Sequence, residues 1–299
     1  MGTVVVLAAQ VGGAKLADGL YRLRGMDLAV VVNTGDDYRH LGLAFSPDLD
    51  TTLFTLAGIA SATAGWEPEG ETRALQGMLK QLGGPDRPLL GDKSLAAPLL
   101  RAEGLANERR LTEITLDFCR RLGIEALVLP MSDDPVRTNV LTDDGAMTFQ
   151  ARISDEVLDA LHSEDLEAVV IGPANPYHGI RPILELNGMR ELLRRRGAPV
   201  VAVTPVVGGK ALQGSAGKMM RELGREPTAL GAATEYRSLA DGFVIDREDL
   251  AFAEGVRSLG MRVLAVHTVM RTPEDRVALA RSVLEFARSI REARALEVE

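Results

Sequence analysis

Residues 4–20 read VVVLAAQVGGAKLADGL and join an apolar, β-branched run to a pair of glycines and then to a helical pattern. The run at residues 4–8 predicts a buried strand, and Leu16 and Leu20 recur at helical spacing. Between them, Gly12 and Gly13 allow backbone N–H groups to approach a ligand closely, at the amino end of a helix whose dipole favours an anion. The stretch therefore predicts a strand, a phosphate-binding turn and a helix, which together open an α/β fold.

Further apolar runs repeat this strand signal at residues 28–32, 125–129, 168–171, 200–203, 243–245 and 263–266. Helical patterns separate the runs, and an amphipathic one closes the chain at residues 277–294. This alternation indicates a doubly wound, mostly parallel sheet. Residues 65–92 are richer in glycine, proline and charge than their flanks. We therefore expect one α/β domain over residues 1–299, with a lid-like helical insertion at about residues 60–120.

The composition favours a protein that handles small molecules. Of its 299 residues 46% are hydrophobic, which suits a well-buried core, and the formal net charge is −8. Basic residues are scattered rather than striped, so we expect no nucleic-acid partner. No apolar run approaches the roughly 18 residues of a membrane span and no leader pattern is present, so we also expect no membrane partner. The single cysteine, Cys119, reads as a core thiol in a reducing compartment, and we expect a cytoplasmic protein.

Polar loops follow five of the predicted strands, at residues 10–15, 33–37, 130–138, 172–180 and 204–210. Ligands of open α/β sheets bind beyond the carboxyl ends of the strands. We therefore expect these five loops to converge on one rim of the sheet and to carry the chemistry.

The second of these loops opens an aspartate-rich segment, residues 31–51, which reads VVNTGDDYRHLGLAFSPDLDT. It contains Asp36, Asp37, Asp48 and Asp50. Magnesium takes oxygen ligands and retains water, so one or two of these carboxylates with substrate phosphates would hold it. The alternative is that single aspartates serve as turn and helix N-cap residues. With a phosphate-binding turn nearby, the set predicts phosphoryl or nucleotidyl chemistry, and not all four aspartates need be metal ligands.

The other loops supply candidates for binding the substrate or nucleotide. Each has a plainer alternative: Lys15 reads equally as a surface lysine, the 130–138 loop as an internally salt-bridged turn, and Trp66 as a packed anchor of the lid. His178 lacks a visible partner, which favours a surface or substrate-positioning role. The candidates are Gly12, Gly13, Lys15, Asn33, Thr34, Trp66, Ser132, Asp133, Arg137, Asn175 and Lys210.

These motifs together resemble the 2-phospho-lactate transferase family of coenzyme F-420 biosynthesis. The resemblance covers nearly the whole chain, and its carriers are VGGAKLADGL at residues 11–20, the segment at 31–58, LTEIT at 111–115, LPMSDDPVRT at 129–138, IGPANPYHGIRPIL at 171–184 and VTPVVGGKALQG at 203–214. It implies a Rossmann-like core, a homodimer and a magnesium-dependent reaction on small molecules. In that reaction the ribityl hydroxyl of a deazaflavin attacks a guanosine-diphospho-linked lactate, phosphoenolpyruvate or glycerate unit and GMP leaves. By this resemblance the four aspartates, Asp36, Asp37, Asp48 and Asp50, are catalytic residues that organise metal, phosphate and hydroxyl, and Asp36, Asp48 and Asp50 are the metal ligands. Gly12, Gly13, Asn175 and Lys210 hold the guanosine diphosphate.

The chain departs from the family pattern at its substrate loops. Ala9 and Gln10 stand where the family has a glycine pair, Ser94 and Pro98 replace a carboxylate and a histidine, and Ala174 replaces a serine. These changes leave open a divergent transferase with another donor or acceptor. A noncatalytic nucleotide-sugar-binding regulator is a further alternative, disfavoured by the aspartate cluster, and the incomplete glycine fingerprint disfavours a nicotinamide-dependent oxidoreductase.

Overall fold

The computed structural model describes residues 2–136, 151–195, 197–211 and 216–298. A seven-stranded sheet lies at its centre in the order β11-β10-β7-β6-β1-β2-β5, and every neighbouring pair is parallel. Its strands are β1 (Thr3–Ala8), β2 (Asp27–Val32), β5 (Leu127–Pro130), β6 (Leu166–Ile171), β7 (Val200–Val203), β10 (Gly242–Asp246) and β11 (Arg262–Val266). Each coincides with one of the seven apolar runs predicted from sequence.

The strand order identifies the architecture. Counted along the chain, the parallel strands lie in the order 3-2-1-4-5-6-7, which is the Rossmann arrangement with one strand added. The order reverses between β1 and β6, so the loops after these two strands diverge and leave a crevice. The predicted Rossmann-like, doubly wound α/β fold with an inserted helical lid is confirmed.

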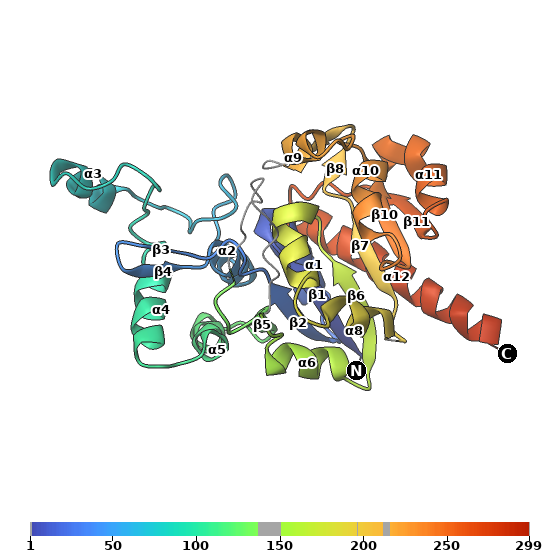
Figure 1. Ribbon diagram of the computed structural model, residues 1–299, viewed down its shortest axis with the longest axis horizontal. Helices are drawn as coiled ribbons and strands as arrows, with labels where there is room; N and C mark the ends of the chain where they lie inside the picture. The colour runs from blue at the N-terminus through green and yellow to red at the C-terminus, as the bar shows by residue number, and fades with distance from the viewer. Residues whose placement is uncertain (1, 137–150, 196, 212–215, 299) are drawn as a thin grey trace, which may run out of the picture.

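Helices cover both faces of the sheet because side chains of each strand point alternately to the two sides (Figure 1). Val4 and Val6 of β1 pack on one face, and Val5 and Leu7 pack on the other. The first face is covered by α1 (Gln10–Arg22), α2 (Pro47–Leu56), α5 (Leu111–Leu122) and α12 (Pro273–Val298). The second is covered by α6 (Asp155–His162), α7 (Arg181–Leu184), α8 (Met189–Arg195), α9 (Ala216–Glu222), α10 (Ala229–Ala233) and α11 (Ala253–Arg257). Short helical turns are η1 (Pro176–Ile180), η2 (Thr234–Tyr236) and η3 (Arg247–Phe252).

Cys119 of α5 lies in the first of these cores. Its burial raises the pKa of the thiol to about 11, so the thiol stays protonated at neutral pH. The prediction of a core thiol is confirmed.

The chain between β2 and β5 forms the insertion. It contains the hairpin β3 (Tyr38–His40) and β4 (Leu43–Phe45), then α2, α3 (Ala74–Gln81), α4 (Ala96–Ala106) and α5. Leu41 and Gly42 both have positive φ, at 50° and 82°, which is the geometry of a two-residue hairpin turn. The hairpin, α3 and α4 stand to one side of the sheet, beyond α2 (Figure 1). A second hairpin, β8 (Val206–Val207) and β9 (Lys210–Ala211), follows β7.

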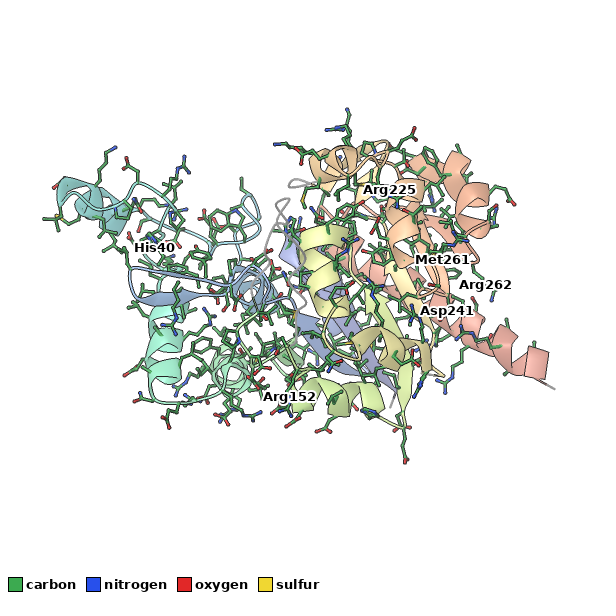
Figure 2. All side chains as sticks on the ribbon, in the orientation of Figure 1. His40, Arg152, Arg225, Asp241, Met261 and Arg262 are labelled. Atoms are coloured by element: carbon green, nitrogen blue, oxygen red, sulfur yellow. The ribbon has the colours of Figure 1, made fainter. Side chains whose placement is uncertain are left out.

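The side chains labelled in Figure 2 show which parts of the chain lie on opposite sides of the molecule. His40 lies on the hairpin of the insertion, whereas Asp241, Met261 and Arg262 lie at the opposite side, near β10, β11 and α12 (Figure 2). No helix in the described part of the chain is long and apolar enough to cross a membrane.

Candidate active site

A pocket of about 720 Å³ lies at the crevice between the loops after β1 and β6. Gln10, Val11 and Gly12 line it on the β1 side, and Pro173 and Asn175 on the β6 side. The loops after β7 and β11 and the insertion segment at residues 62–66 complete its walls. The pocket therefore occupies the place where open α/β sheets bind ligands.

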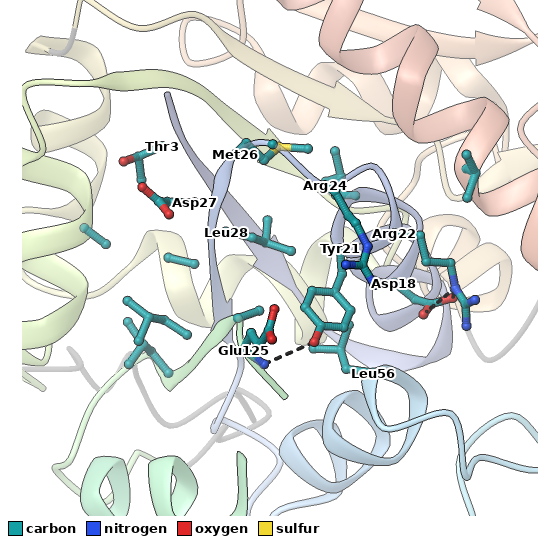
Figure 3. A pocket seen from close by; sticks show the side chains of 18 of the residues that line it. Thr3, Asp18, Tyr21, Arg22, Arg24, Met26, Asp27, Leu28, Leu56 and Glu125 are labelled. Carbon is teal, nitrogen blue, oxygen red and sulfur yellow. Dashed lines mark hydrogen bonds and ion pairs between the residues drawn. The ribbon is translucent and has the colours of Figure 1, made fainter. Parts of the chain in front are cut away.

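A larger hollow of about 1580 Å³ lies at the other end of the sheet (Figure 3). It is bordered by the first residues of β1 and β2 and by Glu125, whose N–H donates to the Tyr21 hydroxyl at 3.1 Å. Asp18 there is already paired with Arg22 and Arg276, at 2.9 and 2.8 Å. Because the glycine turn and the aspartate loop lie at the carboxyl ends of the strands, the smaller pocket is the candidate active site.

The walls of the smaller pocket are positively charged in a protein that is acidic overall. Among its described lining residues only Lys15 and Arg271 carry charge, and both are cations. Lys15 Nζ donates to the carbonyl oxygen of Met270 at 3.1 Å, which joins α1 to the loop after β11. Burial lowers the pKa of Lys15, and the nearby Arg276 lowers it further. The Arg271 guanidinium has no ion pair or side-chain hydrogen bond within the described ranges, so it is free to bind an anion.

The glycine turn presents backbone N–H groups to the same pocket. The N-cap residue of α1, Ala9, makes no side-chain cap. In the first turn the Gln10 N–H donates to Asp48 Oδ1 and the Gly13 N–H donates to the Ala9 carbonyl oxygen, so only part of this helix end is available to a ligand. A Cβ on Gly12 would lie 2.1 Å from the carbonyl oxygen of Pro173, and only glycine allows this approach of the two loops. Lys15, Arg271 and this helix end together suit a phosphate group.

Beside the pocket, one amide draws two carboxylates together. Asn33 Nδ2 donates to Asp48 Oδ2 at 3.0 Å and to Asp36 Oδ2 at 3.4 Å, and it also lies 3.3 Å from the carbonyl oxygen of His178. Asn33 is fully buried at the end of β2, and Gly35 N–H donates to its Oδ1 at 2.9 Å, which fixes the amide. Burial raises the pKa of Asp48 to about 6, and the neighbouring Asp36 carboxylate contributes.

Gln10 connects the carboxylates to His178. Its backbone N–H donates to Asp48 Oδ1 at 2.9 Å. Its side-chain Nε2 lies 3.2 Å from His178 Nε2, and His178 Nδ1 lies 3.1 Å from Asp36 Oδ2. The hydrogen bond to Asp36 raises the pKa of His178. The histidine that lacked a visible partner in the sequence therefore belongs to the carboxylate cluster.

The other two aspartates of the segment, Asp37 and Asp50, have partners other than Asn33. Ser46 Oγ donates to Asp37 Oδ2 at 2.6 Å, while Asp37 Oδ1 is buried without a hydrogen-bond partner in the described structure. Burial raises the pKa of Asp37 to about 8, so this carboxyl is largely neutral at pH 7.

Asp50 forms an ion pair with Arg101, which is 1% exposed. Arg101 also donates to the carbonyl oxygen of Ala44 at 3.0 Å and lies over the ring of Phe118, 5.9 Å from its centroid. The pair therefore joins α2 to the hairpin and to α4, and the Asp50 carboxylate is engaged.

The Asp36–Asp48 pair fits a divalent cation. Two carboxylate oxygens within hydrogen-bonding distance of one amide repel each other, and a cation between them would relieve that repulsion. No cluster of three or more His, Cys, Asp or Glu side chains arranged for a metal is found among the described residues. Magnesium would therefore be held by Asp36 and Asp48 and take its other ligands from phosphate and water.

The other predicted binding residues divide into two groups. Trp66, which is 48% exposed, and Asn175 line the pocket with Gly12 and Lys15, whereas Gly13 packs against Ala8 behind the turn. Thr34 is buried next to the aspartates, and its hydroxyl has no partner in the described structure.

The second group does not line the pocket. Ser132 donates to the carbonyl oxygen of Arg152 at 2.5 Å, and Asp133 accepts from Thr112 N–H at 2.8 Å at the start of α5. Lys210 is exposed on the second hairpin. Arg137 lies outside the described residues.

Several residues of the site were not among the sequence candidates. They are Gln10, Arg101 and residues 268–271. Residues 268–271 could have been found from sequence, because ligands bind at the carboxyl ends of the strands and the segment HTVMRT, residues 267–272, directly follows the seventh strand. Arg101 is separated from Asp50 by 51 residues, and no sequence signal joins them.

Comparison with known proteins gives consistent matches over most of the chain. A family model described as 2-phospho-L-lactate transferase CofD matches residues 4–153 and 147–259. A 2-phospho-L-lactate transferase of Methanosarcina acetivorans is 35% identical over 304 residues, covering 94% of this chain and 98% of the relative. A phosphoenolpyruvate transferase of Streptomyces griseus is 35% identical over 317 residues, covering 96% and 99%.

Solved structures share the fold at low sequence identity. A Bacillus halodurans protein has a TM-score of 0.64 at 16% identity, over 94% of this chain and 98% of that one. A second structure of that protein, described as a member of the UPF0052 family, has a TM-score of 0.62 at 14% identity, over 95% and 98%. These two matches support the fold alone.

Proposed function

The chain belongs to the 2-phospho-L-lactate transferase CofD family, and from this premise we propose that it makes a phosphodiester of coenzyme F-420 biosynthesis. It moves a phospho-lactate-type unit from a guanosine-diphospho-linked donor to the ribityl hydroxyl of a deazaflavin and releases GMP. The unit is phospholactate, phosphoenolpyruvate or phosphoglycerate. Relatives named for the first two of these units support this range. The observation that carries the proposal is the Asp36–Asp48 pair, which is joined to the cationic pocket through Gln10, a lining residue whose N–H donates to Asp48.

The proposed step exchanges one oxygen on phosphorus for another. The ribityl hydroxyl oxygen bonds to the phosphorus that carries the three-carbon acid, and the bond from that phosphorus to the GMP phosphate oxygen breaks. The electron pair of that bond leaves with GMP, and the hydroxyl proton passes to a carboxylate of the Asp36–Asp48 pair. Asp37 is unsuited to accept the proton because its pKa of about 8 keeps it neutral at pH 7.

Positioning and charge neutralisation are the main demands of phosphoryl transfer. Lys15, Arg271 and the amino end of α1 bind the diphosphate of the donor in this proposal. Asn33 and Gln10 hold the carboxylates beside it, and Trp66, which also lines the pocket, stacks on an aromatic ring of a substrate. Magnesium bound by Asp36 and Asp48 would neutralise charge on the transferred phosphate.

An Asp48→Asn variant tests the proposal. Gln10 N–H and Asn33 Nδ2 donate to different oxygens of Asp48, so asparagine keeps one of these hydrogen bonds and loses the other, while it removes a charge that burial already disfavours. We therefore expect a stability loss no larger than that of one buried hydrogen bond, about 1–3 kcal/mol, and a loss of GMP release of about 100-fold. Asp249→Asn is the matched control and should leave GMP release unchanged, because Asp249 is also buried, at 2% exposed, and burial raises its pKa as well, but it does not line the pocket. Unchanged GMP release in Asp48→Asn would contradict the assignment of the site.

The homodimer and the cytoplasmic location stay predictions. Sedimentation of the purified protein and fractionation of cells that express it would test them.

A further inference from the structure

Gln10 has an unusual backbone conformation for its place in the fold. It is the first residue of α1, yet its φ is +55°, a region that L-residues other than glycine, asparagine and aspartate rarely adopt. The preceding Ala9 is extended, with φ −150° and ψ 155°. Strained backbone of this kind persists where surrounding contacts enforce it, and it clusters at functional sites.

The contacts of Gln10 identify what this conformation achieves. The backbone N–H points at Asp48 Oδ1, 2.9 Å away. The side chain reaches across the crevice, where Oε1 accepts from Asn175 N–H at 2.9 Å and Nε2 lies 3.2 Å from His178 Nε2. One residue therefore ties the loop after β1 to Asn175 and His178 of the turn at residues 172–180, and at the same time holds the Asp48 carboxylate.

That turn is itself ordered around Asn175. Asn175 Oδ1 accepts from Tyr177 N–H at 2.9 Å, and Asn175 is 2% exposed. His178 lies within η1, and its Nδ1 is 3.1 Å from Asp36 Oδ2. The chain of contacts thus runs from Asp48 through Gln10 to His178 and on to Asp36, and it closes on Asn33.

We infer that Gln10 is a positioning residue, which holds Asp48, Asn175 and His178 in one arrangement across the crevice so that the Asp36–Asp48 pair faces the phosphate pocket. The expected effect of Gln10 on turnover rests on the proposed transferase function. The structural half of its role, the ordering of the turn at residues 172–180, does not depend on any substrate. A glycine at position 10 would relax the backbone but would remove the tie.

A Gln10→Gly variant separates positioning from a role in folding alone. Glycine adopts positive φ without strain and retains the N–H toward Asp48, so it removes the side-chain tie and little else. Gln10→Ala serves as a second variant, which removes the same tie but keeps the strain. Ser238 also has a positive φ, at 61°, and lies on the exposed surface, so Ser238→Gly is the matched control.

Three quantities are measured: thermal unfolding, amide hydrogen exchange of the peptide spanning residues 172–180, and the kcat and KM of GMP release. For Gln10→Gly we expect a Tm above that of Gln10→Ala, exchange in the 172–180 peptide about tenfold faster than wild type, and kcat lower by about tenfold, with the donor KM within about threefold. Ser238→Gly should change neither exchange in this peptide nor kcat.

Two outcomes would overturn the inference. Wild-type exchange at residues 172–180 in Gln10→Gly would show that the side chain does not hold the turn. Faster exchange with unchanged kcat would show that the turn does not position the reacting groups. Failure of the proposed function is recognised separately, because the wild-type protein would then release no GMP from any guanosine-diphospho donor.

Discussion

Removing one partner of the buried Arg101–Asp50 ion pair should destabilise the protein by about 3–5 kcal/mol. Arg101 is 1% exposed and Asp50 is 9% exposed, so either partner left alone is a charge with little access to water. In Arg101→Met the Asp50 carboxylate loses its cation, and the carbonyl of Ala44 loses a donor at 3.0 Å. For a chain of this size the loss corresponds to a fall in Tm on the order of 10 °C.

The matching change on the other side is Asp50→Asn, which leaves the Arg101 guanidinium without its anion. Because each single variant strands one charge, the double variant Asp50→Asn/Arg101→Met should lose less stability than the sum of the single losses. The partly exposed pair of Arg190 and Glu185 is the control, since its loss in Arg190→Met should cost less than about 1 kcal/mol.

Thermal and urea unfolding of the four proteins measures the coupling, and GMP release is assayed on the same samples. We expect Asp50 to have a structural role. Asp50→Asn should therefore lower the free energy of unfolding, and it should lower GMP release only by the fraction of the protein that is unfolded. An Asp50→Asn protein with wild-type stability and no turnover would refute this reasoning and return Asp50 to the metal site.

Three further predictions concern the pocket and the cluster behind it. The folded pKa of Asp37, about 8, lies above its ordinary value of 3.8, so wild-type stability should fall as pH rises from about 4 to about 8, by up to about 1.4 kcal/mol per pH unit. Asp37→Asn should lack this contribution, and an equal fall of Tm between pH 5 and pH 8 in both proteins would contradict it. Trp66→Ala should raise the deazaflavin KM about tenfold with little change in Tm, because Trp66 is 48% exposed; lower stability with unchanged KM would indicate a packing role. Arg271→Gln should raise the donor KM about tenfold, whereas Arg291→Gln on the exposed surface of α12 should not; equal KM values in the two variants would exclude Arg271 from donor binding.

The fold was largely predictable because its signal is local. Each strand is a short aliphatic run, buried on both faces except in the edge strand β11, which is only partly buried, and such runs are visible in sequence without knowledge of their partners. The order of the strands in the sheet follows less directly. Val4–Ala8 pairs with neighbours from residues 27–32 and 166–171, and only a tertiary structure shows that the second neighbour comes from so far along the chain.

The site was predictable where residue type and loop position suffice. Asp36 and Asp48 follow β2 and the first hairpin, and the structure brings their carboxylates to one amide. The sequence could not separate them from Asp50, because the partner that engages Asp50 is Arg101 on another helix.

The conformation of Gln10 was likewise invisible. A glutamine is not a residue type that signals positive φ, and its contacts with Asp48, Asn175 and His178 span 38, 165 and 168 residues of sequence. Such long-range contacts arise from the packing of the sheet and its loops, not from any local pattern.

The most direct test of the account is a magnesium titration of the purified protein with the deazaflavin acceptor and each guanosine-diphospho-linked donor. GMP is followed by chromatography and the acceptor by mass spectrometry. The account predicts magnesium-dependent GMP release in step with a deazaflavin product that has gained one phospho-acid unit. Donor binding without GMP at any magnesium concentration would contradict the transferase and favour a protein that only senses the nucleotide.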